Sequence, residues 1–124
     1  MSDAVWIDGE WRSGNGPKFQ NHCPATGDMV WESASANAGD VTAAVESARR
    51  AFHDWSRTPQ SERTAILEAY ADEIGKRTDA IAEVISRDMG KALWESRGEA
   101  ATMKAKVAVS IAAQVERAGG KVQE

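Results

Sequence analysis

The stretch from Thr58 to Lys91 constrains the fold most strongly, because its apolar residues recur with the period of an α-helix. Gly75 and the polar run after it predict a break, with Thr78 or Asp79 capping a second helix. Gly90 is typical of a left-handed stop. The stretch therefore predicts a helical hairpin or a long kinked helix with one buried stripe. The stripe consists of Ile66, Leu67, Tyr70, Ile74, Ile81, Val84, Ile85 and Met89.

Cap signals place the helix ends. Asp40 is the predicted cap of a first helix, and Thr58 is the predicted cap of the next, with Pro59 at its first helical position. A last helix is predicted to begin near Trp94 or Ser96 and to end at Arg117, where Gly119-Gly120 would terminate it. Apolar stripes line the first helix (Val41, Ala44, Val45, Ala48, Phe52 and Trp55) and the last (Ala100, Met103, Val107, Ile111 and Val115).

The first 36 residues carry strand and turn signals instead. Asp8-Gly9 supplies the positive φ angles of a two-residue hairpin turn, and Pro24–Gly27 is typical of a second turn. Such short strands bury little by themselves, because a small sheet needs a partner surface. The predicted strands are Val5–Ile7, Glu10–Arg12, Phe19–Cys23 and Met29–Ser33.

These patterns predict an α+β fold for the chain of 124 residues. A short antiparallel β meander would occupy residues 1–36, and about four helices would occupy residues 40–118. The length lies within the range of one domain. A sheet without a partner surface already suggests that the domain is incomplete.

Composition restricts the classes of partner. The net charge of −4 and the dispersed basic residues argue against binding to nucleic acid or to an anionic membrane surface. No apolar run approaches the roughly 20 residues needed to cross a bilayer. Met1-Ser2-Asp3 does not begin a signal-peptide pattern. One cysteine cannot form an internal disulfide, and with two histidines it makes a poor metal site. We therefore expect a soluble, cytoplasmic chain.

Few residues are candidates for chemistry. Cys23 is the only thiol, but His22 beside it should point to the opposite face of a strand, so a structural or incidental role is favoured. His53 lies among polar neighbours and is read as a surface residue. The carboxylates of Glu95 and Glu99, four residues apart, are expected on a solvated face.

Two Gly-Lys segments invite a phosphate-loop interpretation. Gly90-Lys91 and Gly119-Gly120-Lys121 both follow helices, whereas a phosphate loop precedes one. Helix termination is therefore the preferred interpretation. We expect no catalytic, cofactor-binding or metal-binding residue in this chain.

Five short motifs, in order, resemble the amino-terminal region of the aldehyde dehydrogenase superfamily. They are Trp6–Trp11, Cys23–Asp28, Ala51–Ser56, Glu62-Arg63 and Asp88–Lys91. The second resembles the family's Asn-Pro-Ala-Thr-Gly-Glu turn, with cysteine in place of asparagine. The last resembles its Glu-Thr-Gly-Lys tetrapeptide. The resemblance implies part of an α/β cofactor-binding domain in a longer, homo-oligomeric NAD(P)-dependent enzyme.

The same resemblance implies that this chain is inactive by itself. In the family, the nucleophilic cysteine, the general-base glutamate and the backbone that binds NAD all come later in the sequence. A family-type cation contact at Glu99 is a further possibility that the resemblance raises. The chain is therefore expected to be the opening piece of the enzyme, with NAD bound by the missing part.

A finer resemblance concerns the last helix. Trp94–Glu99, Met103 and the run Lys106–Ile111 resemble the succinylglutamate-semialdehyde dehydrogenases of arginine degradation. That similarity implies a small-molecule aldehyde substrate, N-succinylglutamate 5-semialdehyde, oxidised with NAD. Because this helix borders the substrate entrance in the family, the candidate entrance residues are Ile111, Gln114 and Ala118. Ordinary packing is the competing interpretation of these three residues.

A function of a different class remains open from the sequence. The chain could be a free-standing helical module that binds or regulates a partner without catalysing a reaction. A Gly-Pro-x-Asn-Phe-Pro segment soon after Glu124 would favour the enzyme over the module.

Overall fold

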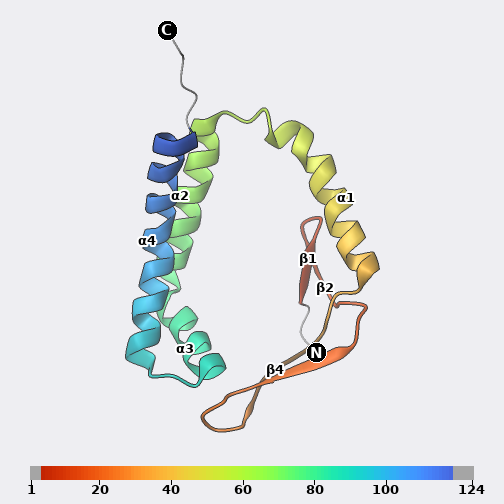
Figure 1. Cartoon of the computed structure of the whole chain (residues 1–124), viewed down its shortest axis with the longest axis vertical. Helices are drawn as coiled ribbons and strands as arrows, with labels where there is room; N and C mark the ends of the chain where they lie inside the picture. Colours follow the sequence, from red (N-terminus) through yellow and green to blue (C-terminus); the bar gives the residue numbers. More distant parts are fainter. Residues whose placement is uncertain (1–3, 119–124) are drawn as a thin grey trace. The chain divides into compact units, whose positions relative to one another are not determined.

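The computed structural model describes residues 4–118, in which four short strands are followed by four helices (Figure 1). The strands are β1 (Val5–Ile7), β2 (Glu10–Arg12), β3 (Lys18–His22) and β4 (Met29–Ala34). The helices are α1 (Ala38–Trp55), α2 (Gln60–Lys76), α3 (Thr78–Met89) and α4 (Leu93–Ala118). This order confirms the predicted α+β class.

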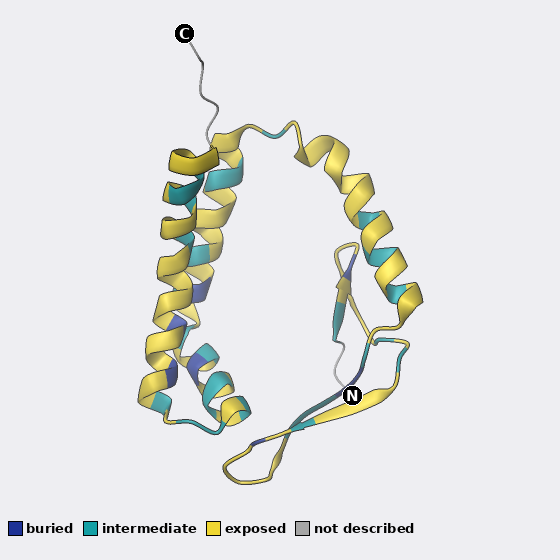
Figure 2. Ribbon diagram, in the orientation of Figure 1, coloured by how far each residue is buried: buried dark blue, intermediate teal, exposed yellow. Residues whose placement is uncertain are grey.

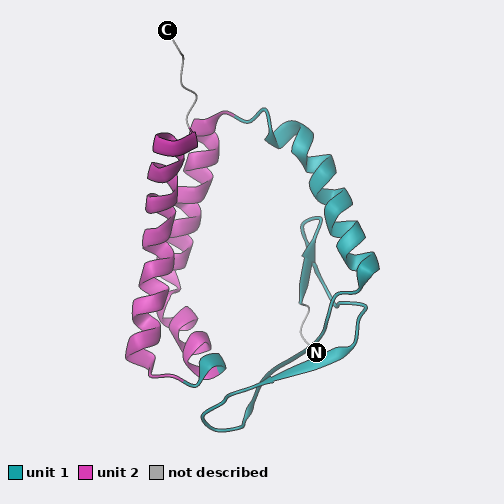
Figure 3. Cartoon of the chain, in the orientation of Figure 1, with its two compact units in different colours: residues 1–58, 88–90 teal, residues 59–87, 91–124 magenta. Residues whose placement is uncertain are grey.

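The chain divides into two compact units, coloured separately in Figure 3. Unit 1 contains the described residues up to Thr58, together with Asp88–Gly90. Unit 2 contains Pro59–Arg87 and the described residues from Lys91 onward. All strands and α1 therefore belong to unit 1, whereas α2, α4 and most of α3 belong to unit 2.

The strands of unit 1 form two separate antiparallel hairpins. Asp8 and Gly9 have φ angles of 58° and 81°, which confirms the predicted two-residue turn between β1 and β2. Trp6 pairs with Trp11 across this hairpin, and their ring centroids lie 5.2 Å apart, edge to face. The connection to β3 packs on the residue after β4 instead of extending the first sheet, because Gly16 N–H donates to the Ser35 carbonyl at 2.7 Å.

The second hairpin pairs β3 with β4 and contains an irregularity between Asn21 and His22. Phe19 and Trp31 contact edge to face, with ring centroids 4.9 Å apart. The side-chain amide of Asn21 donates a hydrogen bond to the carboxylate of Asp88. Residues at the end of α3 are therefore part of the same compact unit as this hairpin.

Helix α1 begins with a capping box. Asn37 is its N-cap: its side-chain oxygen accepts from Asp40 N–H at 3.0 Å, and the Asp40 carboxylate accepts from Asn37 N–H at 2.9 Å. The prediction of Asp40 as the cap was wrong, since Asp40 occupies the third helical position. The helix also packs beside β1, where Ser47 and Arg50 donate to the Asp8 carboxylate at 2.8 and 3.1 Å.

Helices α2 and α3 meet at the break that the sequence predicts. Helix α2 ends at Lys76 and α3 begins at Thr78, whose hydroxyl donates to the Gly75 carbonyl at 3.0 Å. The prediction of Thr58 as the α2 cap was wrong: Pro59 is the N-cap, and the Thr58 hydroxyl donates backward to the Asp54 carbonyl. After α3, Gly90 has φ +64°, which confirms the left-handed stop.

Helix α4 begins at Leu93, one residue before Trp94 and three before Ser96, the two predicted starts. It packs against α2, and an ion pair between Arg97 and Asp79 at 2.9 Å joins it to α3. The predicted terminators Gly119-Gly120 lie outside the described residues. None of the helices described between residues 38 and 118 combines the length and apolarity required to cross a bilayer.

Few side chains are buried within residues 4–118 (Figure 2). The prediction of one buried stripe over α2 and α3 was wrong for most of its members: Ile74 is buried, whereas Ile66, Leu67, Tyr70, Val84 and Met89 are exposed. The helical period is present, but the rest of unit 2 offers little surface to cover it. On α1, Val41, Val45, Phe52 and Trp55 are also exposed.

Candidate functional site

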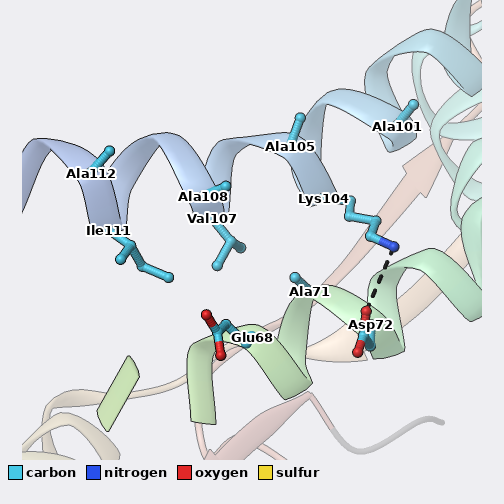
Figure 4. Close-up of a pocket in the computed structure, with 10 residues that line it drawn as sticks. All are labelled: Glu68, Ala71, Asp72, Ala101, Lys104, Ala105, Val107, Ala108, Ile111 and Ala112. Atoms are coloured by element: carbon cyan, nitrogen blue, oxygen red, sulfur yellow. Dashed lines mark ion pairs between the residues drawn. The ribbon is translucent and has the colours of Figure 1, made fainter. Parts of the chain in front are cut away.

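A groove of about 590 Å³ runs between α2 and α4 within unit 2 (Figure 4). Val107 and Ile111 project from α4 toward α2, and Lys104 points to Asp72. We call this cavity the alanine groove, because half of its lining residues are alanines. It is lined by Glu68, Ala71, Asp72, Ala101, Lys104, Ala105, Val107, Ala108, Ile111 and Ala112.

The sequence of α4 explains this shape. Ala101, Ala105, Ala108 and Ala112 recur every three or four residues, so their methyl groups fall along one side of the helix. Methyl groups fill little space, which leaves an open channel beside the contact with α2. This alanine spacing is the signal in the sequence that could have predicted the groove.

The polar groups of the alanine groove form a sparse rim. Lys104 Nζ lies 3.6 Å from Asp72 Oδ1, and both side chains are at least half exposed. Such a pair contributes only about 0–1 kcal/mol to stability. The lining residues include no thiol, hydroxyl or imidazole group. The groove can therefore accommodate an apolar group, but its lining offers no thiol or hydroxyl nucleophile and no imidazole base.

The three predicted entrance residues lie along one side of α4. Ile111 lines the alanine groove, Gln114 is half-buried, and Ala118 is exposed at the last described position. Only Ile111 of the three belongs to that lining. A role for these residues at a substrate entrance stays a prediction.

A second groove, of about 350 Å³, lies on the other side of the contact between α2 and α4. We call it the Leu67 groove. Its lining residues are Leu67, Tyr70, Ile74, Met103, Lys106, Val107 and Ser110. Its apolar side chains are large, and it contains no carboxylate. The apolar residues of the two helices that form this groove were predicted from the sequence, but the packing of α2 against α4 was not.

Cys23 is buried in unit 1, in the turn after β3. The Thr26 hydroxyl next to the sulfur lowers the pKa of the thiol, with help from the backbone N–H groups of Thr26 and Ala25. His22, the neighbouring imidazole, is exposed, whereas Cys23 is not. This arrangement supplies no adjacent base for a nucleophile and supports the structural interpretation of Cys23.

The other candidate side chains have local partners. His53 is exposed and lies 3.0 Å from an Asp54 carboxylate oxygen. Glu99 forms an ion pair with Lys91 within this chain, and a family-type cation contact at Glu99 stays a possibility raised by the resemblance. Lys91 is thus engaged by a carboxylate; its segment follows α3 as predicted and also precedes α4, but no strand leads into it as a phosphate loop requires. Among residues 4–118, no group of three or more potential ligand side chains could hold a metal ion.

Comparisons with known proteins agree with the motifs. The model of the aldehyde dehydrogenase family matches residues 11–124. The chain is 50% identical over 117 residues to the N-succinylglutamate 5-semialdehyde dehydrogenase of Paraburkholderia xenovorans, covering 94% of this chain and 24% of that protein. It is 48% identical over 119 residues to N-succinylglutamate 5-semialdehyde dehydrogenase 2 of Caulobacter vibrioides, covering 96% of this chain and 24% of the relative.

Solved structures show the same likeness. A betaine aldehyde dehydrogenase variant of Staphylococcus aureus in complex with NAD⁺ superposes with a TM-score of 0.87 and 25% identity. The superposition covers 100% of this chain and 25% of that one. The chain thus spans about a quarter of the length of the relatives that it matches.

Proposed function

The chain belongs to the aldehyde dehydrogenase family, and we propose that it forms the amino-terminal part of an NAD-dependent enzyme that oxidises N-succinylglutamate 5-semialdehyde to succinylglutamate in arginine catabolism. The observation that carries this proposal is the 50% identity over 94% of the chain to a dehydrogenase of that name. The motifs of the last helix support the same substrate. A cytoplasmic, homo-oligomeric enzyme completes the proposal.

The side chains of this segment indicate which steps of the reaction it can and cannot carry out. Oxidation of an aldehyde through covalent catalysis requires an activated nucleophile and a base. The two α2–α4 grooves present neither a thiol nor an imidazole, and Cys23 is buried without an adjacent base. We therefore assign the chemistry, and the site for NAD, to the other part of the longer enzyme. NAD would supply the hydride acceptor there.

This segment would contribute part of the wall of the path by which the aldehyde enters. Helix α4 carries Ile111, Gln114 and Ala118 on one side, and Ile111 already borders a groove with an apolar floor. In the proposed enzyme, this end of α4 borders the path by which the aldehyde enters. Small side chains such as Ala108 and Ala112 would leave room for an extended substrate.

A chimera tests the function directly. In it, this chain replaces the matching quarter of the Paraburkholderia xenovorans relative, and NADH formation is followed with N-succinylglutamate 5-semialdehyde and with benzaldehyde. We expect kcat/KM for the succinylated aldehyde within about tenfold of the parent enzyme, equivalent to about 1.4 kcal/mol of transition-state stabilisation. We also expect a preference over benzaldehyde. A chimera that melts and assembles like the parent but does not oxidise the succinylated aldehyde would refute the proposal.

The alternative, a free-standing module that binds a partner, draws on the exposed apolar faces of the helices. Those faces are equally expected in a piece of a larger enzyme, so they do not favour the module. The sequence identity to enzymes over nearly the whole chain favours the dehydrogenase segment.

A further inference from the structure

The β1–β2 hairpin is held to helix α1 near both of its ends. Just beyond the open end of the hairpin, the backbone and side chain of Asn15 donate to the carboxylate of Asp40, in the first turn of α1, at 2.9 and 2.6 Å. At the turn of the hairpin, the Asp8 carboxylate accepts from Ser47 and Arg50 at 2.8 and 3.1 Å. Asp40 and Ser47 are about two helical turns apart, so the hairpin lies along the helix (Figure 1).

The attachment at the open end is part of a larger network. Asn15 and Asp40 join the capping box of α1, because the Asn37 side chain donates to the Asn15 carbonyl at 3.3 Å and the Asn37 N–H donates to Asp40 at 2.9 Å. Beside them, the Gly16 N–H donates to the Ser35 carbonyl at 2.7 Å. Several hydrogen bonds that support one another therefore fix this end of the hairpin.

The attachment at the turn is weaker. A cavity of about 380 Å³ lies between the hairpin and α1, and small residues line it on the helix side: Ala44, Ser47, Ala48 and Ala51. Within residues 5–12, only Ile7 is buried. The side chains of Asp8 and Arg50 are 57% and 61% exposed, and exposed ion pairs of this kind are weak. The turn is therefore held by one apolar side chain and two exposed polar contacts.

Release of the turn would also melt the hairpin. Among the described strands, β1 and β2 pair only with each other, and a single two-stranded hairpin is at best marginally stable in water. Its aromatic pair, Trp6 and Trp11, is itself 56% and 62% exposed. The β3–β4 hairpin has further support, because Asn21 donates to Asp88.

We propose that the β1–β2 hairpin is a strap on α1 that opens at its turn while the rest of unit 1 stays folded, and that Asp8 is its latch. Asp8 then has two roles: with φ 58° it reverses the chain, and its carboxylate binds α1. Opening uncovers Ile7 and the small residues of α1 beneath the turn. The strap operates within unit 1 whichever aldehyde the enzyme oxidises.

Amide hydrogen exchange of the 124-residue chain, resolved by residue with NMR, tests the strap. A segment that opens locally exchanges faster than the structure around it. We expect the ladder amides of β1 and β2 to exchange at least about tenfold faster than those of β3 and β4. Equal protection of the two hairpins would overturn the proposal, because it would mean that both open in a single event.

Substitutions on α1 remove the latch without changing the turn. Ser47→Ala combined with Arg50→Gln eliminates the serine hydroxyl and the guanidinium that bind Asp8. Exchange in β1 and β2 should accelerate about fivefold, whereas exchange in β3 and β4 should change by less than about twofold. Acceleration of both hairpins to the same extent, or of neither, would overturn the assignment of Asp8 as the latch.

The matched control is Thr42→Ala combined with Arg49→Gln. It also removes one hydroxyl and one guanidinium group from α1, but the Thr42 hydroxyl donates within the helix, to the Ala38 carbonyl at 3.0 Å. Arg49 takes no part in the hydrogen bonds to Asp8. The control should leave exchange in β1 and β2 within about twofold of the unsubstituted chain. An acceleration equal to that of the latch variant would assign the effect to helix stability and refute the latch.

Circular dichroism gives an independent readout. The indole rings of Trp6 and Trp11 lie edge to face with centroids 5.2 Å apart, so their transitions couple, and Trp6→Phe identifies this signal by difference. On heating, the coupled signal should disappear before the helical signal does. Loss of both signals in one transition would contradict independent opening of the strap.

Discussion

Gly90 shows how one position can require glycine for two independent reasons. Its φ of +64° lies in the left-handed region, which disfavours side chains. A Cβ atom at this position would also lie 2.8 Å from Pro24 Cγ and 2.9 Å from Ala25 N. The sequence predicted the first reason from the position of Gly90 after a helix. It could not predict the second, because the contact joins residues far apart in the chain.

Gly90→Ala should therefore destabilise the chain. The backbone conformation alone should cost about 1–2 kcal/mol, and displacement of the turn around Pro24 should add to this. Gly98→Ala is the matched control, since Gly98 is helical and has no neighbouring atom within 4 Å of an added Cβ. It should stabilise by about 0.5–1 kcal/mol. Urea unfolding measures both variants, and equal changes for the two would contradict this explanation.

Asp40 makes the stability of unit 1 depend on pH. Its carboxylate accepts hydrogen bonds from the backbone N–H groups of Asn37 and Asn15, both at 2.9 Å, and from the Asn15 side chain at 2.6 Å. These bonds lower the pKa of Asp40 below its ordinary value of 3.8. The group therefore contributes stability that is complete above pH 3.8 and is lost as the pH falls through the lower, folded-state pKa.

Comparison of the wild-type chain with Asp40→Ala should reveal this dependence. The difference in unfolding free energy between them should be largest near neutral pH and should shrink below pH 3.8. Urea unfolding at a series of pH values measures it, and NMR titration of the Asp40 carboxyl carbon gives the midpoint. A difference that stays constant down to acidic pH would contradict the assigned role.

Cys23 should have no part in turnover. The chain by itself should not oxidise N-succinylglutamate 5-semialdehyde with NAD, because the only thiol is buried and has no adjacent base. Cys23→Ser in the active chimera should leave kcat within about twofold of the unsubstituted chimera. Steady-state NADH formation measures both expectations. Turnover by the unfused chain that disappears with Cys23→Ser would prove the opposite.

At the scale of elements, periodicity predicts helices better than it predicts their burial. The apolar residues of α2 and α3 follow one helical pattern, yet Ile74 is 6% exposed and Val84 is 64% exposed. Only the position of a facing element decides between these outcomes. The sequence predicts the apolar side of α2 and α3. The packing of α4 against α2 determines which residues of that side are buried.

Substitution by alanine should have very different effects on stability at Ile74 and at Val84. Ile74→Ala should cost about 2–5 kcal/mol through lost burial and a residual cavity. Val84→Ala, on α3 and largely exposed, should change stability by less than about 0.5 kcal/mol in the unfused chain. Denaturant unfolding of the two variants measures the difference. Similar costs would mean that the exposed face of α3 is covered in solution.

Helix starts were predicted to within a few residues, and the errors have a common cause. Asn37 and Asp40 are both good capping residues, and the structure uses both in one reciprocal pair. Thr58 and Pro59 are likewise adjacent signals, and the extended conformation of Pro59 makes it the boundary. Local propensity narrows the choice of cap to neighbouring residues. At α1, Asp40 also accepts hydrogen bonds from Asn15, in a segment that helix-start signals do not consider.

At the scale of the whole molecule, apolar surface dominates the expected behaviour. Large apolar residues are exposed on every helix, among them Phe52 on α1, Tyr70 on α2, Val84 on α3 and Trp94 on α4. The unfused chain should therefore bind a dye for apolar surfaces and associate as its concentration rises. Fluorescence titration and sedimentation velocity measure this. A monomer at all concentrations, without dye binding, would contradict the expectation.

The sequence carried more information about family than about site. Dispersed motifs such as Glu62-Arg63 and Asp88–Lys91 pointed to the aldehyde dehydrogenase family, and the family match over residues 11–124 confirms this. The two grooves between α2 and α4 could not be predicted, because each combines residues from helices that are separated by α3. The role of Ile111 at a substrate entrance remains a prediction. Such an entrance is formed by several segments, and this chain spans about a quarter of the length of its relatives.

The division into units has a consequence for synthesis on the ribosome. Asn21, on the first strand of the β3–β4 hairpin, leaves the exit tunnel early, but Asp88, which accepts its hydrogen bond, follows 67 residues after it. At about 5–20 residues per second, this interval lasts on the order of ten seconds. The amino-terminal part of unit 1 therefore emerges before Asp88, and its hydrogen bond from Asn21 can form only after that later segment has been synthesised. During that interval, chaperones can reach its exposed tryptophans.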